Sequence, residues 1–179
     1  MDKFIALLRG INVSGQKKIK MADLRQHLTD VGLEQVQTYI QSGNILFDSP
    51  GKTLDECAKL IKDKIQAEYS FDVPVMMRTA ADIAHIVENN PMPDVPAENY
   101  NIYIVTLLDA EPTAEAKAEI PAEGPAGEQT KIIGREIYTF YPNGSGRTKL
   151  TTNFFEKKLG VNATARNWKT LIKLTDMTQ

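Results

Sequence analysis

Hydrophobic residues near the N-terminus predict a strand, a helix and a hairpin. Residues 3–9 are apolar from Phe4 to Leu8, and an unbroken apolar run is typical of a strand covered on both faces. Residues at helical spacing follow at Met21, Leu24, Leu28 and Val31. Residues 35–40 and 44–48 then predict two strands joined by a glycine-containing turn.

A long helix and a further strand complete the first half. Thr53 and Glu56 have the spacing of a capping box, in which each side chain bonds the other residue's backbone amide. The buried stripe expected on this helix is Leu54, Cys57, Ile61 and Ile65. A strand over 73–78 follows, so the order is β-α-β-β-α-β, that of the split βαβ or ferredoxin-like fold.

The second half repeats this plan after a short helix over 80–89 and a proline-rich segment over 90–96. Its expected elements are a strand over 100–108, an acidic helix over 112–120, a hairpin of 130–133 with 136–141, and helices over 151–159 and 165–174. Thr164 is expected to cap the last helix, which places Arg166 in its first turn.

We therefore expect an α+β protein of two ferredoxin-like βαββα(β) units related by structural duplication, with antiparallel or mixed sheets packed against helices. The expected domains are an N-terminal unit over 1–78, a helix and proline-rich linker over 79–98, and a C-terminal unit over 99–179 with an extra C-terminal helix. Because the opening strands are apolar on both faces, we expect the sheets to cover each other or to pack in a dimer.

Composition narrows the class of protein but does not identify a function. The chain has 179 residues, of which 42% are hydrophobic and 25% charged, and this excludes collagen-like, disulfide-scaffold and disordered proteins. Cys57 is the single cysteine, so no intrachain disulfide forms, which fits a reducing cytosol. The apolar run near the N-terminus is too short for a signal peptide or a membrane span. We expect a cytoplasmic protein.

Charge is unevenly distributed although the net charge is only −2. Residues 1–20 contain five cationic residues and one acidic residue, and residues 145–173 contain seven and one. Residues 107–130 contain six acidic residues and one lysine. If the basic ends meet in the fold, they form a face that attracts anions, whereas ordinary solvated surface explains them equally well.

Several kinds of chemistry find no support in the sequence. His27 and His85 are far apart and isolated, so we expect no metal site. We found no Walker-type phosphate loop, no dinucleotide-binding glycine fingerprint and no nucleophile elbow, and we expect no cofactor. No catalytic residue can be named from spacing alone.

Three polar clusters are the candidate ligand-binding residues. The first follows the first strand, the second forms the hairpin tip, and the third lies near the C-terminus behind a glycine-rich segment. Their members are Arg9, Asn12 and Lys18, then Gln41, Ser42 and Asn44, then Lys149, Arg166, Asn167 and Trp168. Cations and amides of this kind suit carboxylate, phosphate or polar groups. Turn chemistry also explains the second cluster, and core packing also explains Trp168.

The clusters resemble the signature of a bacterial family catalogued as domain-of-unknown-function family 1697. The resemblance rests on the strings Leu-Leu-Arg-Gly-Ile-Asn-Val at 7–13, Thr-Tyr-Ile-Gln-Ser-Gly-Asn at 38–44 and Thr-Ala-Arg-Asn-Trp at 164–168. It covers nearly the whole chain and implies a compact α+β fold in a bacterial cytosolic protein, without an established activity. Ser14 and Thr148 depart from the usual glycine and serine. We expect the three clusters to converge on one site.

Three classes of function remain open. The first is a module that binds an anionic ligand, either a phosphorylated small molecule or a nucleic acid. The second is an enzyme acting on a small anionic substrate, with Lys18 or Lys149 as a base of lowered pKa. The third is a structural protein that pairs its sheets in a homodimer. We expect no membrane partner in any of these cases.

Overall fold

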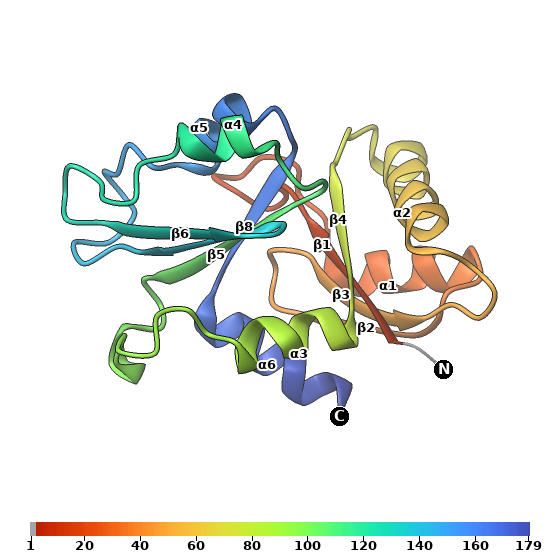
Figure 1. Cartoon of the computed structure of the whole chain (residues 1–179). Helices are drawn as coiled ribbons and strands as arrows, with labels where there is room; N and C mark the ends of the chain where they lie inside the picture. Colours follow the sequence, from red (N-terminus) through yellow and green to blue (C-terminus); the bar gives the residue numbers. More distant parts are fainter. Residues whose placement is uncertain (1–2) are drawn as a thin grey trace. The chain divides into compact units, whose positions relative to one another are not determined.

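The chain carries one order of elements twice. The structure, a computed structural model, describes residues 3–179 and shows the series β-α-β-β-α-β-α in each half (Figure 1). The first series is β1 (Lys3–Leu8), α1 (Met21–Asp30), β2 (Glu34–Tyr39), β3 (Asn44–Asp48), α2 (Leu54–Tyr69), β4 (Val75–Thr79) and α3 (Ala80–Glu88). After a short 3-10 turn (Ala97–Asn99), the second series is β5 (Tyr103–Leu108), α4 (Ala114–Ala118), β6 (Gln129–Ile133), β7 (Glu136–Phe140), α5 (Thr152–Leu159), β8 (Ala163–Asn167) and α6 (Trp168–Thr178).

Each series forms a four-stranded sheet in which every neighbouring pair is antiparallel. The strand orders are β2-β3-β1-β4 and β6-β7-β5-β8, so equivalent strands take equivalent places. The expected α+β architecture, with two similar units and helices packed on antiparallel sheets, is confirmed.

The two sheets match in register as well as in order. Leu8 pairs with Val75 in the first sheet, and Leu108 pairs with Ala163 in the second. The amide of Leu8 donates to a carbonyl of the adjacent hairpin at 2.9 Å, and the amide of Leu108 donates to the equivalent hairpin at 2.9 Å. A residue of one unit therefore has a defined counterpart in the other.

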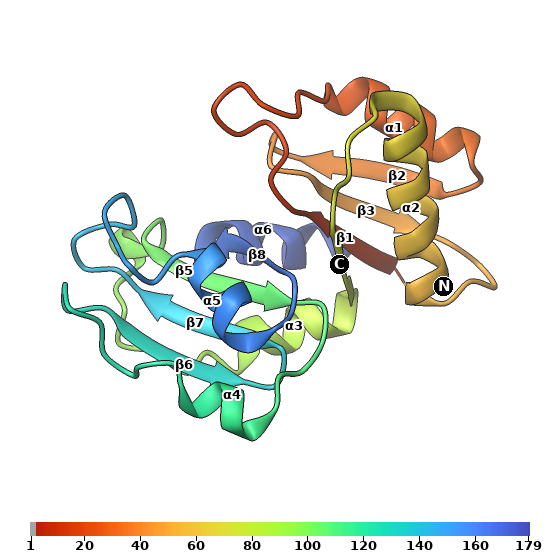
Figure 2. The same cartoon turned by 90° about the horizontal axis from the view of Figure 1, so that it is seen from above.

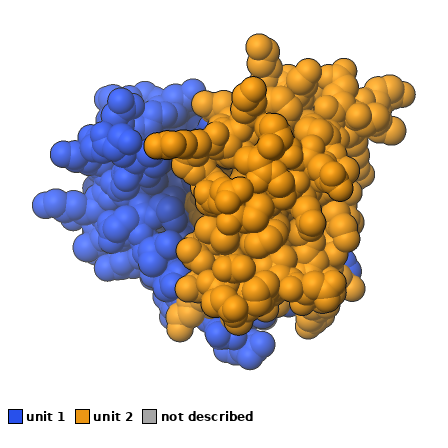
Figure 3. Space-filling model, turned by 90° about the vertical axis from the view of Figure 1, so that its left-hand side faces the viewer, with its two compact units in different colours: residues 1–85, 174–179 blue, residues 86–173 orange. Residues whose placement is uncertain are grey.

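The chain divides into two compact units, coloured separately in Figure 3. Unit 1 consists of residues 1–85 and 174–179, and unit 2 consists of residues 86–173. The proline-rich segment lies within unit 2, where Met92 is buried and Asn90 accepts a hydrogen bond from the Tyr103 hydroxyl at 2.8 Å. The expected domain boundaries, 1–78, 79–98 and 99–179, stay a prediction.

In unit 1, α1 and α2 cover one face of the sheet (Figure 2). The core between them contains Ala6, Leu8, Leu24, Leu28, Ile45, Phe47, Cys57, Ile61, Ile65 and Met77. The capping box of Thr53 and Glu56 is present at the start of α2, as predicted. Residues of β1 that point to the opposite face, Ile5 and Leu7, are also fully buried, so the expectation of a strand covered on both faces is confirmed.

In unit 2, the sheet packs against α4 and α5 on one face. Core residues there are Leu108, Ile137, Leu150, Phe155, Leu159 and Ala163. On the other face, the Trp168 ring stacks on Tyr103, with ring centroids 4.8 Å apart, and its exposed fraction is 2%. Across residues 3–179, the helices are too short or too polar to cross a lipid bilayer.

The predicted helix over 165–174 is wrong at its start. Residues Ala163–Asn167 form β8, and α6 begins at Trp168, so Arg166 lies in a strand and Thr164 caps no helix. Pairing of β8 with β5 outweighs the helix propensity of this short segment. Asn167 is the cap instead, because its Oδ1 accepts the Thr170 amide at 3.0 Å.

Candidate functional site

Three loops of unit 1 meet at one end of its sheet, where β1 ends and β3 and β4 begin. They are residues 9–20 after β1, residues 40–43 between β2 and β3, and residues 70–74 before β4. They meet because Leu8 at the end of β1 pairs with Val75 at the start of β4, and β3 begins beside them. We call these three segments the loop edge of unit 1.

Asn12 joins the first two loops. Its Nδ2 donates to the Gln41 carbonyl at 2.8 Å and to the Ile19 carbonyl at 3.0 Å, while its Oδ1 accepts the Ile19 amide at 2.9 Å. Its φ of 53° lies in the left-handed region, which asparagine tolerates better than most residues do. The Asn12 side chain therefore joins the first two predicted clusters by a hydrogen bond.

The third loop is tied to the first at two points. The Arg9 amide donates to the Pro74 carbonyl at 3.1 Å, and the Lys17 ammonium donates to the Asp72 carbonyl at 2.7 Å. Lys17 has a φ of 46°, so this loop holds a bulky residue in an unfavourable conformation. Hydrogen bonds therefore hold the first loop both to the hairpin tip and to the third loop.

The hairpin tip is packed tightly against the end of β1. Asn44 is fully buried, and its Nδ2 donates to the Tyr39 carbonyl at 3.0 Å and to the Ser42 hydroxyl at 3.1 Å. Gly43 has a φ of 87°, and a Cβ there would lie 2.7 Å from the Leu8 Cβ. The hydrogen bonds of the Asn44 side chain, one of them to Ser42, therefore stabilise the conformation of the hairpin tip. Gln41 is exposed at the end of the tip.

The loop edge carries four cationic residues and one acidic residue. Lys18 and Lys20 are exposed, and their side-chain ammonium groups make no hydrogen bond or ion pair within residues 3–179. Arg9 is half-buried. The acidic residue, Asp72, is engaged by Lys62 at 3.2 Å. The loop edge therefore presents net positive charge to solvent.

Sequence reasoning missed two residues of this surface. Val13 is 58% exposed and Ile40 is 48% exposed, which is unusual for large aliphatic side chains. Ile40 also has a φ of 51°. The available signal was an isoleucine at a turn position, where glycine or asparagine is usual.

The remaining predicted residues belong to unit 2. Lys149 is exposed at the end of a glycine-rich loop that Glu128 anchors, because Glu128 accepts a hydrogen bond from the Thr148 hydroxyl at 2.6 Å. That bond, with backbone amides that also donate to the carboxylate, lowers the pKa of Glu128. Hydrogen bonds to the Glu128 carboxylate therefore hold the loop in place, and Lys149 is exposed on it.

Arg166 and its neighbours are mostly buried. Arg166 is 6% exposed, and one guanidinium nitrogen donates to the Thr164 hydroxyl and to the Ala165 carbonyl, both at 2.8 Å. Asn167 caps α6, and Trp168 packs among tyrosine rings. Their expected convergence with the loop edge of unit 1 stays a prediction.

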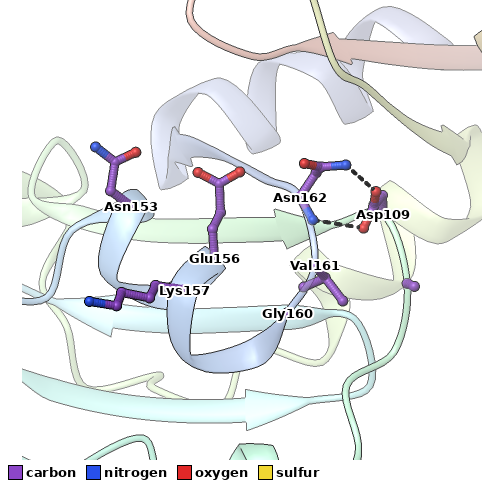
Figure 4. A pocket seen from close by; sticks show the side chains of 8 residues that line it. Asp109, Asn153, Glu156, Lys157, Gly160, Val161 and Asn162 are labelled. Carbon is purple, nitrogen blue, oxygen red and sulfur yellow. Dashed lines mark hydrogen bonds between the residues drawn. The ribbon is translucent and has the colours of Figure 1, made fainter.

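Unit 2 has an open pocket of about 660 Å³ that the sequence did not indicate (Figure 4). Its lining includes Asp109, Asn153, Glu156, Lys157 and Asn162. The Asp109 carboxylate accepts from the amide and the side chain of Asn162 at 3.0 and 2.9 Å. It lies at the sheet edge equivalent to the loop edge of unit 1, but Asp109 takes the place of Arg9, so the two edges differ in charge.

Residues 3–179 contain no group of three or more histidine, cysteine, aspartate or glutamate side chains arranged to hold a metal ion. His27 lies edge-on to the Tyr69 ring, and its Nδ1 is 4.0 Å from the Glu68 carboxylate. Cys57 is buried in the core of unit 1, in agreement with its predicted packing role.

Comparison with known proteins relates this geometry to a family. The model of the family DUF1697, described as "Protein of unknown function", matches residues 1–138. A solved structure, the conserved bacterial protein SP0830 from Streptococcus pneumoniae, is similar over 99% of this chain and 98% of its own, with 26% identity and a TM-score of 0.75. No curated protein gives a significant match. The chain belongs to the DUF1697 family.

Proposed function

We propose that the loop edge of unit 1 binds a phosphate-bearing anion, presented by a small molecule or by a nucleic acid. The observation that carries this proposal is the Asn12 side chain, which fixes the cationic loop 9–20 onto the hairpin tip. A loop that is ordered before binding loses less entropy when its ligand arrives.

The charges support phosphate as the group that is bound. Lys18 and Lys20 are exposed ammonium groups that make no bonds to residues 3–179, so binding an anion does not require them to break an ion pair. Ammonium groups bind phosphate oxygens as point charges from many directions. The exposed amide of Gln41 lies on the segment that Asn12 holds and offers donors and an acceptor.

Equilibrium titration with a mononucleotide and with a short single-stranded RNA, at low salt, tests this proposal. The variant Lys18→Gln/Lys20→Gln should weaken binding of the ligand that is recognised by about tenfold or more, because two charge-assisted contacts are lost. The matched control is Lys52→Gln/Lys59→Gln, which removes the same charge from exposed positions of unit 1 outside the loop edge.

The control should bind like the wild type. If the two double variants bind equally well, the loop edge is not the site. If neither ligand binds the wild-type protein at low salt, the proposal is wrong.

A further inference from the structure

Two exposed aliphatic side chains flank the bond that joins the loops of unit 1. Val13 directly follows Asn12, and Ile40 directly precedes Gln41, whose carbonyl accepts the Asn12 side chain at 2.8 Å. Both are about half exposed or more, at 58% and 48%. The loop edge thus carries two exposed aliphatic side chains as well as its exposed cationic side chains.

Ile40 stands in a conformation that does not suit it. Its φ is 51°, and a β-branched residue is among the least tolerant of the left-handed region. Burial does not explain the choice of isoleucine, because much of the side chain remains in solvent. Strain combined with apolar exposure is typical of a residue that contacts a ligand.

We propose that the ligand of the loop edge is a nucleotide, with its base against Ile40 and Val13 and its phosphate at Lys18 and Lys20. This inference rests on the proposed function and names its ligand class. A nucleotide carries a flat face of low polarity next to an anion, and the loop edge offers exposed aliphatic side chains and exposed ammonium groups on the joined loops. A sugar phosphate has the anion but lacks that face.

The test compares a phosphorylated sugar with and without a base, and then a free nucleotide with a strand. Uridine 5′-monophosphate and ribose 5-phosphate are titrated into the full-length protein, together with an octamer of uridylate. The wild type should bind the base-containing monophosphate about fivefold more tightly than ribose 5-phosphate, as expected for covering part of an aliphatic side chain.

Ile40→Gly should abolish that preference without lowering thermal stability, because glycine relieves the left-handed strain. The matched control is Ile133→Gly, since Ile133 is an isoleucine of unit 2 that is 52% exposed. It should keep the preference for the base. Stronger binding of the octamer than of the monophosphate identifies a strand as the source, and equal binding identifies the free nucleotide.

The inference is overturned if Ile40→Gly keeps the wild-type preference, or if the wild type binds both monophosphates equally while binding still depends on Lys18 and Lys20. In those cases the proposed function stands and only the ligand class is wrong. Binding to anionic phospholipid vesicles that is lost in Ile40→Gly, without any base preference, also overturns it. Absence of all phosphate binding removes the proposed function itself.

Discussion

Arg78 of β4 and Arg166 of β8 occupy the same position in the two similar units. Arg78 pairs with Ile5 and Arg166 pairs with Val105, and these partners are counterparts in β1 and β5. In each case one guanidinium nitrogen donates to the carbonyl of the preceding residue at 2.8 Å. The exposed fractions are 0% and 6%, so each unit buries a permanent charge at the same register position.

Replacing either arginine should destabilise the protein. Arg166→Met removes the donor to the buried Thr164 hydroxyl and to the partly buried Ala165 carbonyl, which costs about 2 kcal/mol or more. Arg78→Met should have a similar effect. The exposed Arg147 is the control, and Arg147→Met should change stability by less than about 0.5 kcal/mol. Denaturant unfolding measures all three, and an Arg166→Met protein as stable as the control variant contradicts this prediction.

A side chain at position 43 should destabilise the protein more than one at position 51. Gly43 and Gly51 have φ values of 87° and 80°, but a Cβ on Gly43 meets Leu8 at 2.7 Å whereas one on Gly51 meets nothing within 4 Å. Gly51→Ala therefore measures conformational strain alone, about 1 kcal/mol. Gly43→Ala adds a steric clash and should cost about 1–3 kcal/mol more. Equal unfolding midpoints for the two variants would show that the hairpin tip can move away from β1.

Asn12 should control the order of the loop that follows β1. In Asn12→Ala, the Ile19 amide loses its acceptor and should exchange its hydrogen faster with solvent, and the protein should lose about 2 kcal/mol. Asn12→Asp keeps an acceptor for Ile19 but loses the bond to Gln41, so it should protect the Ile19 amide and still weaken ligand binding. Unchanged Ile19 exchange in Asn12→Ala contradicts the role given to this side chain.

The Glu128 carboxylate should make the free energy of unfolding depend on pH at acidic pH. Its pKa is lowered below the ordinary 4.5, chiefly by the bond from Thr148. A carboxyl whose folded pKa is depressed adds stability that is fully present above its unfolded pKa and is lost as pH falls through the folded value. Glu128→Gln should therefore be less stable than the wild type near about pH 7, and this difference should shrink below about pH 4. A difference that does not change with pH rules out the carboxylate as its source.

Local patterns predicted most of the fold because they act over short distances. The capping box at Thr53 and the glycine turn before Asn44 need only neighbouring residues, and both are present. The strand Ala163–Asn167 was missed because its conformation depends on β5, which lies about 60 residues earlier and provides its hydrogen bonds. Once β8 is recognised, the second half completes the order of the first.

The site was only partly accessible from sequence for a related reason. The sequence predicts that Arg9, Asn12 and Gln41 lie in loops, and they do, but it does not show that Asn12 bonds the other loop. Polar type also does not reveal burial, and Asn44 turned out to be fully buried beneath the hairpin tip. Ile40 was passed over because its significance lies in its backbone angle and exposure.

The salt dependence of RNA binding tests the central claim most directly. Each phosphate contact made by a lysine contributes to the slope of log K against log salt concentration, at about 0.7 per contact for a single strand. For an octamer of uridylate, Lys18→Gln/Lys20→Gln should reduce the magnitude of that slope by about 1.4, and Lys52→Gln/Lys59→Gln should leave it unchanged. An unchanged slope in the first variant would show that these two lysines do not contact phosphate and would contradict the proposed site.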